Sequence, residues 1–104
     1  MEKEMFTSEK YMTKGIHNEL EHDLQLLIWG LIENMEIEKD YLQVFKMRSI
    51  DQNSVRIIHK QEIPNYEKEH IISELRETAD MNIFVIDSGE YCTMMLAHEY
   101  WYIT

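Results

Sequence analysis

One segment of this sequence has a clear helical pattern, and it limits the folds open to the whole chain. Apolar side chains recur there at spacings of three and four residues, which places them on one face of a helix: Leu20, Leu24, Leu27, Ile28, Leu31 and Met35. Asn18 is the predicted N-cap, with Glu21 three residues later, and a start nearer Asp23 is the alternative. The apolar face of this main helix must be covered by the rest of the protein.

The segments that follow have the composition and turn residues of two β-hairpins. Residues 41–50 and 55–63 are rich in β-branched and aromatic residues and flank four turn formers. Pro64 ends this first hairpin, because it has no N–H to donate to a ladder. A second hairpin is predicted from residues 83–86 and 91–97. Gly89 supplies the positive φ that the tight turn between these two strands needs.

Two further segments have weaker signals. Residues 10–14 alternate enough for a short strand that stops at Gly15. Residues 65–80 fit either an extended run from Tyr66 to Ile72 or a helix, and we expect a short helix in their later half.

These elements predict a single α+β domain over residues 1–104. Because strands and helices do not alternate regularly, we expect an antiparallel sheet of about four to five strands with the main helix packed on one face. A lone cysteine cannot form an internal disulfide, which excludes a disulfide-stabilised secreted framework.

The charge of the chain is strongly acidic and unevenly placed. The formal net charge is −10, yet residues 41–60 contain four basic residues and one acidic residue. An acidic surface disfavours direct nucleic-acid binding, because phosphate attraction needs a basic one. No run of apolar residues is long enough for a membrane span, and the first residues do not resemble a signal peptide. We therefore expect a cytoplasmic protein with no membrane association.

Near the C-terminus, the stretch DSGEYCTMMLAHE places Asp87, Ser88, Cys92 and His98 close together in sequence. On one extended strand, Cys92 and His98 would share a face but lie roughly 20 Å apart. A base must come within about 3 Å of its nucleophile, so this pair cannot act together. Cys92 is therefore predicted to be a small core residue, and Asp87 and Ser88 to form the turn.

The histidines do not have the spacing of a metal site. His17 and His22 are five residues apart, which places them on different sides of a helix, and His59, His70 and His98 are scattered. Phosphate-loop, nucleophile-elbow and zinc-protease motifs are also absent from the sequence. We expect no catalytic residue, no metal and no cofactor.

Six short segments spread over almost the whole chain form a distinctive combination: YMTKGI (11–16), LQLLIW (24–29), DYLQVF (40–45), HKQEIPNY (59–66), FVIDSG (84–89) and TMMLAHEY (93–100). Together they resemble an uncharacterised family of small proteins from Firmicutes and their mobile elements, domain-of-unknown-function family 960. The resemblance implies a bacterial or phage protein of the cytoplasm and brings no established activity, cofactor or catalytic residue. His98 departs from the acid that is more usual at this position in the family.

A candidate interface is drawn from polar residues that a fold alone hardly demands and from apolar residues off the main helical stripe: Leu26, Trp29, Gln43, His59, Gln61 and Tyr66. The alternatives are buried polar pairing for the polar residues and coverage by the same chain for Leu26 and Trp29. Aromatic anchors beside a polar rim are typical of interfaces.

The leading hypothesis is a non-enzymatic protein-binding or regulatory module that acts through a protein partner or self-association. The alternative is an acidic inhibitor that mimics DNA, which requires acids in rows on one face. A small enzyme or ligand binder is the third class, and it requires a pocket lined by His59, Tyr66 and Cys92.

Overall fold

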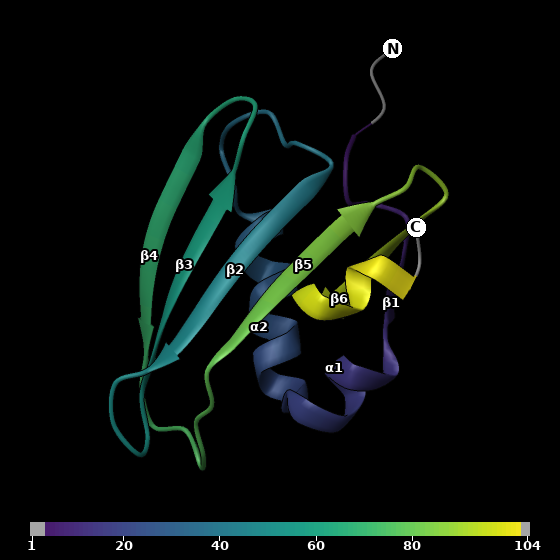
Figure 1. Ribbon diagram of the computed structural model, residues 1–104. Coiled ribbons are helices and arrows are strands. Elements are labelled where there is room, and N and C mark those ends of the chain that lie inside the picture. The colour runs from purple at the N-terminus through teal and green to yellow at the C-terminus, as the bar shows by residue number, and fades with distance from the viewer. Residues whose placement is uncertain (1–3, 103–104) are drawn as a thin grey trace.

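A mixed α+β architecture is formed by residues 4–102, the part of the chain that the computed structural model describes (Figure 1). Along the chain the elements are β1 (Glu9–Met12), α1 (Lys14–Glu19), α2 (His22–Glu33), β2 (Leu42–Ser49), β3 (Val55–Gln61), β4 (Tyr66–Ile72), β5 (Met81–Asp87), β6 (Tyr91–Leu96) and the 3₁₀ helix η1 (Ala97–Tyr102). The predicted α+β class is therefore confirmed.

Six strands of the described residues form one sheet, in the order β1-β6-β5-β2-β3-β4. Five of them make an antiparallel sheet, whereas β1 pairs with β6 in parallel. The prediction of four to five antiparallel strands is thus wrong in two details, the strand count and the direction of β1. A parallel neighbour requires a long crossover, and here most of the chain separates β1 from β6.

The helical region is divided into two helices rather than one. Leu20 has extended backbone angles between α1 and α2, and the side-chain amide of Gln25 donates to its carbonyl oxygen across the corner (2.8 Å). Asn18 lies inside α1, so its prediction as the N-cap is wrong; α2 begins at His22, close to the alternative start. The predicted apolar stripe is buried or half-buried against the sheet.

The short strand predicted at residues 10–14 is β1, but it ends at Met12 and not at Gly15. Gly15 lies in the first turn of α1. The Glu99 carboxylate lies against it and accepts hydrogen bonds from the Thr13 hydroxyl (2.6 Å), the Gly15 N–H (3.3 Å) and the Leu96 N–H (2.8 Å). A Cβ atom added at Gly15 would lie only 2.7 Å from a Glu99 oxygen. Burial alone would raise the pKa of Glu99, but these hydrogen bonds outweigh it and lower the pKa.

Both predicted hairpins are confirmed. In the first, Ser49 pairs with Val55 across the turn. In the second, Gly89 has a φ of +100°, and its N–H donates to the Asp87 carboxylate (2.8 Å). The other oxygen of Asp87 accepts from the Phe6 N–H (2.8 Å), so this turn residue also anchors the N-terminal segment.

In residues 65–80 the extended alternative is confirmed for the first half, and the helix expected in the second half is wrong. Tyr66 to Ile72 are strand β4, which pairs with β3 over its full length. The residues after β4 form a loop that is held by the turn between β2 and β3, since the Leu75 N–H donates to the Asn53 carbonyl (2.9 Å) and the Asn53 amide donates to the Leu75 carbonyl (2.8 Å). These long-range bonds compete with the local helical tendency and outweigh it.

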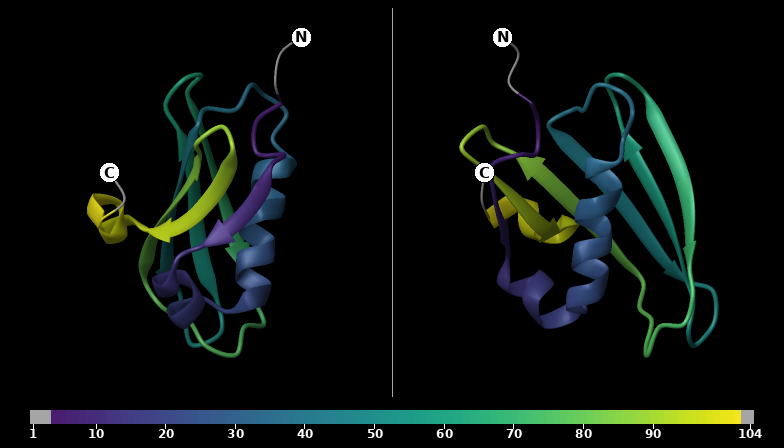
Figure 2. Two further views of the ribbon diagram at one scale, coloured as in Figure 1. Left: turned by 90° about the vertical axis from the view of Figure 1, so that its right-hand side faces the viewer. Right: turned by 180° about the vertical axis from the view of Figure 1, so that it is seen from behind.

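The sheet has two unlike faces. Its inner face packs on α2, and the core lies between them, as the views from the side and from behind show (Figure 2). The core residues on the sheet are Phe45, Met47, Val55, Ile57, Ile83, Val85, Cys92, Met94 and Leu96. On the outer face, η1 lies over β5 and β6 and packs Tyr100 edge-on against Phe84 (5.9 Å between ring centroids).

Candidate functional site

The side chains that suggested nucleophilic chemistry lie at opposite ends of β6. Cys92 pairs with Asp87 beside the turn, whereas His98 lies in η1 beyond the last strand residue. Leu96 lies four positions after Cys92 along the strand, a length of roughly 13 Å. Cys92 is fully buried, with its sulfur 3.4 Å from the Ser8 hydroxyl. This placement is that of a core residue.

His59 and His70 are neighbours on the inner face of β3 and β4, while His17, His22 and His98 lie on other elements. Within residues 4–102, no three His, Cys, Asp or Glu side chains are grouped closely enough to hold a metal ion. Neither α-helix of that region is long and apolar enough to cross a membrane.

Two of the predicted interface residues, Gln43 and His59, are completely buried on the inner face of the sheet. His59 Nε2 lies 2.6 Å from the Gln43 carbonyl oxygen, and because an amide oxygen only accepts, Nε2 must hold the proton. The imidazole stacks on Phe45 (4.2 Å between centroids) and meets the edge of Tyr66 (5.1 Å). Burial, and then the charge of nearby His70, lowers the pKa of His59 to about 4, so the ring is neutral at pH 7.

Gln61 continues this network toward the end of the sheet and is also buried, with 3% of its surface exposed. Its carbonyl oxygen accepts from the Gln43 amide (2.7 Å) and from the Asp40 N–H (2.9 Å). Its amide donates to the carbonyl oxygens of Glu38 (2.9 Å) and Pro64 (2.8 Å). These bonds hold the segment before β2 and the turn between β3 and β4 against the sheet.

The burial of Gln43 and His59 corrects their prediction as interface residues, because a partner cannot contact them directly. Gln61, with 3% of its surface exposed, reaches the surface only in the lining of a groove. Of the two interpretations drawn from the sequence, the buried polar pairing is the one that the structure shows. The sequence contains no signal that distinguishes a buried glutamine side chain from an exposed one here. Glutamine can occupy the alternate positions of either strand face.

The other three predicted interface residues reach the surface to different degrees. Leu26 is 56% exposed on α2. Trp29 is half-buried against the core, and the Lys10 ammonium lies over its ring, 5.7 Å from the centroid. Tyr66 is half-buried against His59. Their role as contacts for a partner stays a prediction.

The outer face of the sheet has an apolar centre that η1 does not cover. Strand register places Leu42, Val44, Ile58 and Ile86 together on this face, where all four are half-buried. We call these four residues the open-face patch. Charged side chains border it on β3 and β4, where Arg56 pairs with Glu69 (3.1 Å) and Lys60 with Glu67 (3.6 Å).

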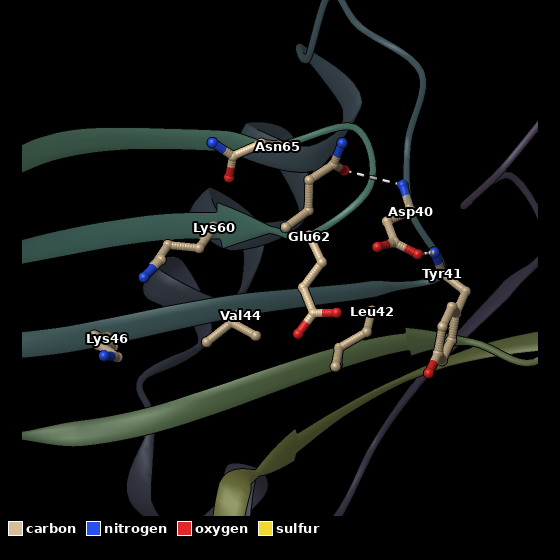
Figure 3. A pocket seen from close by; sticks show the side chains of 9 residues that line it. Asp40, Tyr41, Leu42, Val44, Lys46, Lys60, Glu62 and Asn65 are labelled. Atoms are coloured by element: carbon tan, nitrogen blue, oxygen red, sulfur yellow. Dashed lines mark hydrogen bonds between the residues drawn. The ribbon is translucent and has the colours of Figure 1, made fainter.

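A groove of about 390 Å³ lies at one end of this patch, between β2 and the turn that follows β3 (Figure 3). Its apolar wall is Leu42 and Val44, and its polar lining includes Lys46, Glu62 and Asn65. This volume falls in the range of known ligand sites, roughly 300–1,000 Å³. Strand alternation places Leu42, Val44 and Lys46 on one face, but the sequence contained no sign that this face would be left open.

Several polar groups of the groove are already used by the protein itself. The Asp40 carboxylate accepts from the Tyr41 N–H (2.8 Å) and the Ile63 N–H (3.1 Å), and Lys60 is paired with Glu67. In contrast, the side chains of Lys46, Glu62 and Asn65 make no hydrogen bond or ion pair within the described residues. These three groups are available to a ligand.

The fold and this face define a small α+β domain with a covered inner sheet face and a partly open outer one. The chain belongs to the family described as a staphylococcal protein of unknown function (DUF960), whose model matches residues 9–99. The resemblance seen in the sequence is therefore confirmed.

A crystal structure of a protein of unknown function from Enterococcus faecalis has the same fold. It superposes with a TM-score of 0.79 at 23% sequence identity, covering 95% of this chain and 97% of the other. Among curated proteins, none matches this sequence.

Proposed function

We propose that this protein is a non-enzymatic protein-binding module whose partner packs on the open-face patch. The observation that carries this proposal is a half-buried apolar group on the outer sheet face, bordered by charged pairs on β3 and β4: Leu42, Val44, Ile58 and Ile86. In an antiparallel sheet with one solvated face, that face usually alternates to polar residues. A contiguous apolar patch with a polar border is typical of an interaction surface.

The surface of α2 is the competing location. Leu26 is exposed there, but Trp29 already has Lys10 over its ring, and Lys10 is itself 3.7 Å from Glu33. This aromatic side chain is therefore partly engaged within the chain, whereas among residues 4–102 no helix lies over β2 and β3 on the outer face (Figure 1). The contrast favours the sheet face.

The alternative function, mimicry of DNA, needs unpaired acids in rows on one face. Acidic residues of this protein lie on both layers: Glu33 is on α2, and Glu67 and Glu69 are on the outer face of β4. The latter two are paired with Lys60 and Arg56. Their distribution does not favour mimicry, and the protein-binding proposal is the one we carry forward.

The proposal can be tested with Val44→Asp, which places a charge in the middle of the open-face patch. Leu26→Asp is the matched control, because it adds the same charge to an exposed apolar position on α2. Each variant and the wild type would be immobilised and used to capture proteins from an extract of the organism that encodes the chain. A captured protein would then be purified and its affinity for all three measured.

We expect Val44→Asp to weaken binding of the purified partner at least tenfold and Leu26→Asp to leave it within twofold. If Leu26→Asp abolishes binding and Val44→Asp does not, the surface of α2 is the interface and the proposed location is wrong. A wild type that sediments as a monomer and captures nothing would remove the proposal altogether. Sedimentation of the wild type also distinguishes a second copy of this chain from a different protein as the partner.

A further inference from the structure

The groove beside the open-face patch has basic side chains at one end and the Glu62 carboxylate farther along its length (Figure 3). Lys46 projects from β2, four residues beyond Leu42, and Glu62 follows the last residue of β3. Figure 3 shows the Lys46 and Lys60 side chains on one side of the Glu62 carboxylate and Tyr41 on the other. Val44 lies between Lys46 and the Glu62 carboxylate, and Leu42 lies beyond that carboxylate, toward Tyr41.

The strand register sets the spacing of the backbone positions that carry these side chains. Val44 pairs with Lys60, and the same register continued past Gln61 brings the backbone of Glu62, in the turn, near the level of Leu42. Lys46 is four strand residues away from that level, which is roughly 13 Å at about 3.3 Å per residue. An extended peptide repeats the same spacing: its side chains at positions i, i+2 and i+4 share one face and span that length.

The volume of the groove favours an extended occupant over a helical one. A volume of about 390 Å³ over roughly 13 Å of length has a cross-section of roughly 30 Å². A helix with side chains is about 10–12 Å across and is too wide for this space. The Asn65 amide, which has both a donor and an acceptor free, suits the backbone N–H and C=O of an extended chain.

We infer that this groove binds an extended peptide segment in which an acidic and a basic side chain are four residues apart, with an apolar side chain midway. The acid pairs with Lys46, the base pairs with Glu62, and the apolar residue rests on Val44. This inference rests on the proposed function and names the kind of partner segment that the open face accepts.

The test uses the full chain labelled with ¹⁵N and the capped pentapeptide D-S-V-S-K, titrated by amide chemical shifts. The peptide S-D-K-V-S has the same composition and net charge but places the two charges side by side. We expect D-S-V-S-K to bind in the millimolar range and to shift the amides of Leu42, Val44 and Asn65. The rearranged peptide should bind about fivefold more weakly, because an exposed charge pair contributes up to about a fivefold change in affinity.

Two protein variants with the same change in net charge separate local recognition from overall attraction. Lys46→Glu should weaken binding of D-S-V-S-K about fivefold, whereas Lys68→Glu, on the inner side of β4, should leave it unchanged.

Equal binding of the two peptides, equal effects of the two variants, or amide shifts confined to α2 would each overturn the inference. A partner that is captured through Val44 while no pentapeptide prefers the groove would refute the peptide inference and leave the proposed function standing. If Val44→Asp does not weaken binding of the partner, both the peptide inference and the proposed function are refuted.

Discussion

Acidification should destabilise this protein through His59. The ring is neutral in the folded protein, because burial and then the charge of His70 lower its pKa to about 4. In the unfolded chain the ordinary value is about 6.5. Between these two values the unfolded state binds a proton that the folded state does not, so the free energy of unfolding falls as the pH falls.

The size of this effect follows from the two pKa values. Between pH 7 and pH 5 the proton linkage of His59 lowers the free energy of unfolding by about 2 kcal/mol. This loss continues to grow until the pH approaches 4. His70 acts in the same direction, since burial and then the charge of Lys68 lower its pKa as well. A loss of about 2 kcal/mol is a large fraction of the stability of a domain of this size.

The assay is urea unfolding of the wild type and of His59→Gln at pH 7 and pH 5. A glutamine side chain can still donate to the Gln43 carbonyl but does not titrate. The substitution changes no acidic residue, so the titration of the carboxylates is common to both proteins. We expect the wild type to lose about 2 kcal/mol more than the variant over this interval. His98→Gln, a change at an exposed histidine, controls for the removal of an imidazole.

The reasoning fails if wild type and His59→Gln lose the same stability between pH 7 and pH 5. If the variant does not fold, the imidazole resonances of wild-type His59 decide the matter. They should stay constant from pH 7.5 to pH 5, and a midpoint near pH 6.5 would contradict the buried neutral ring.

Three other substitutions test the fold around the groove and the helices. Gly15→Ala should lose about 1–2 kcal/mol in urea unfolding, because the new Cβ displaces the Glu99 carboxylate from its hydrogen bonds. Gly30→Ala, where no atom lies within 4 Å of the added Cβ, should instead gain about 0.5–1 kcal/mol, and equal effects at the two glycines would contradict this account. Gln61→Leu should lose about 2–3 kcal/mol and speed hydrogen exchange at the Asp40 amide, since that N–H loses its acceptor; unchanged exchange would show that the network does not hold this segment.

Several elements were predictable because their signals are local. The helical stripe from Leu24 to Met35 and the alternation around the two hairpins depend on neighbours a few residues away, and these elements are found where they were expected. The Gly89 turn was predictable for the same reason, since a positive φ is a property of one residue.

Other features were missed or left open because distant residues decide them. Tyr66 to Ile72, for which an extended run was one alternative, became a strand because β3 offers a full ladder of partners, including the Arg56–Glu69 and Lys60–Glu67 pairs. Gln43, His59 and Gln61 were predicted at an interface, yet Gln43 hydrogen-bonds to both of the others inside the protein. Their mutual contact depends on the register of β2 against β3, which periodicity within one strand does not reveal.

Residue order alone was sufficient to establish the α+β class, the main helix and both hairpins of this chain, because each depends on spacings within a short segment. The parallel placement of β1 against β6, the coverage of the outer face by η1 and the groove between Lys46 and Glu62 arose only when remote segments were brought together. The physical reason is that the side chains of a strand alternate between two faces, and alternation alone does not decide which face is buried. Packing against the helices determines which face is left open.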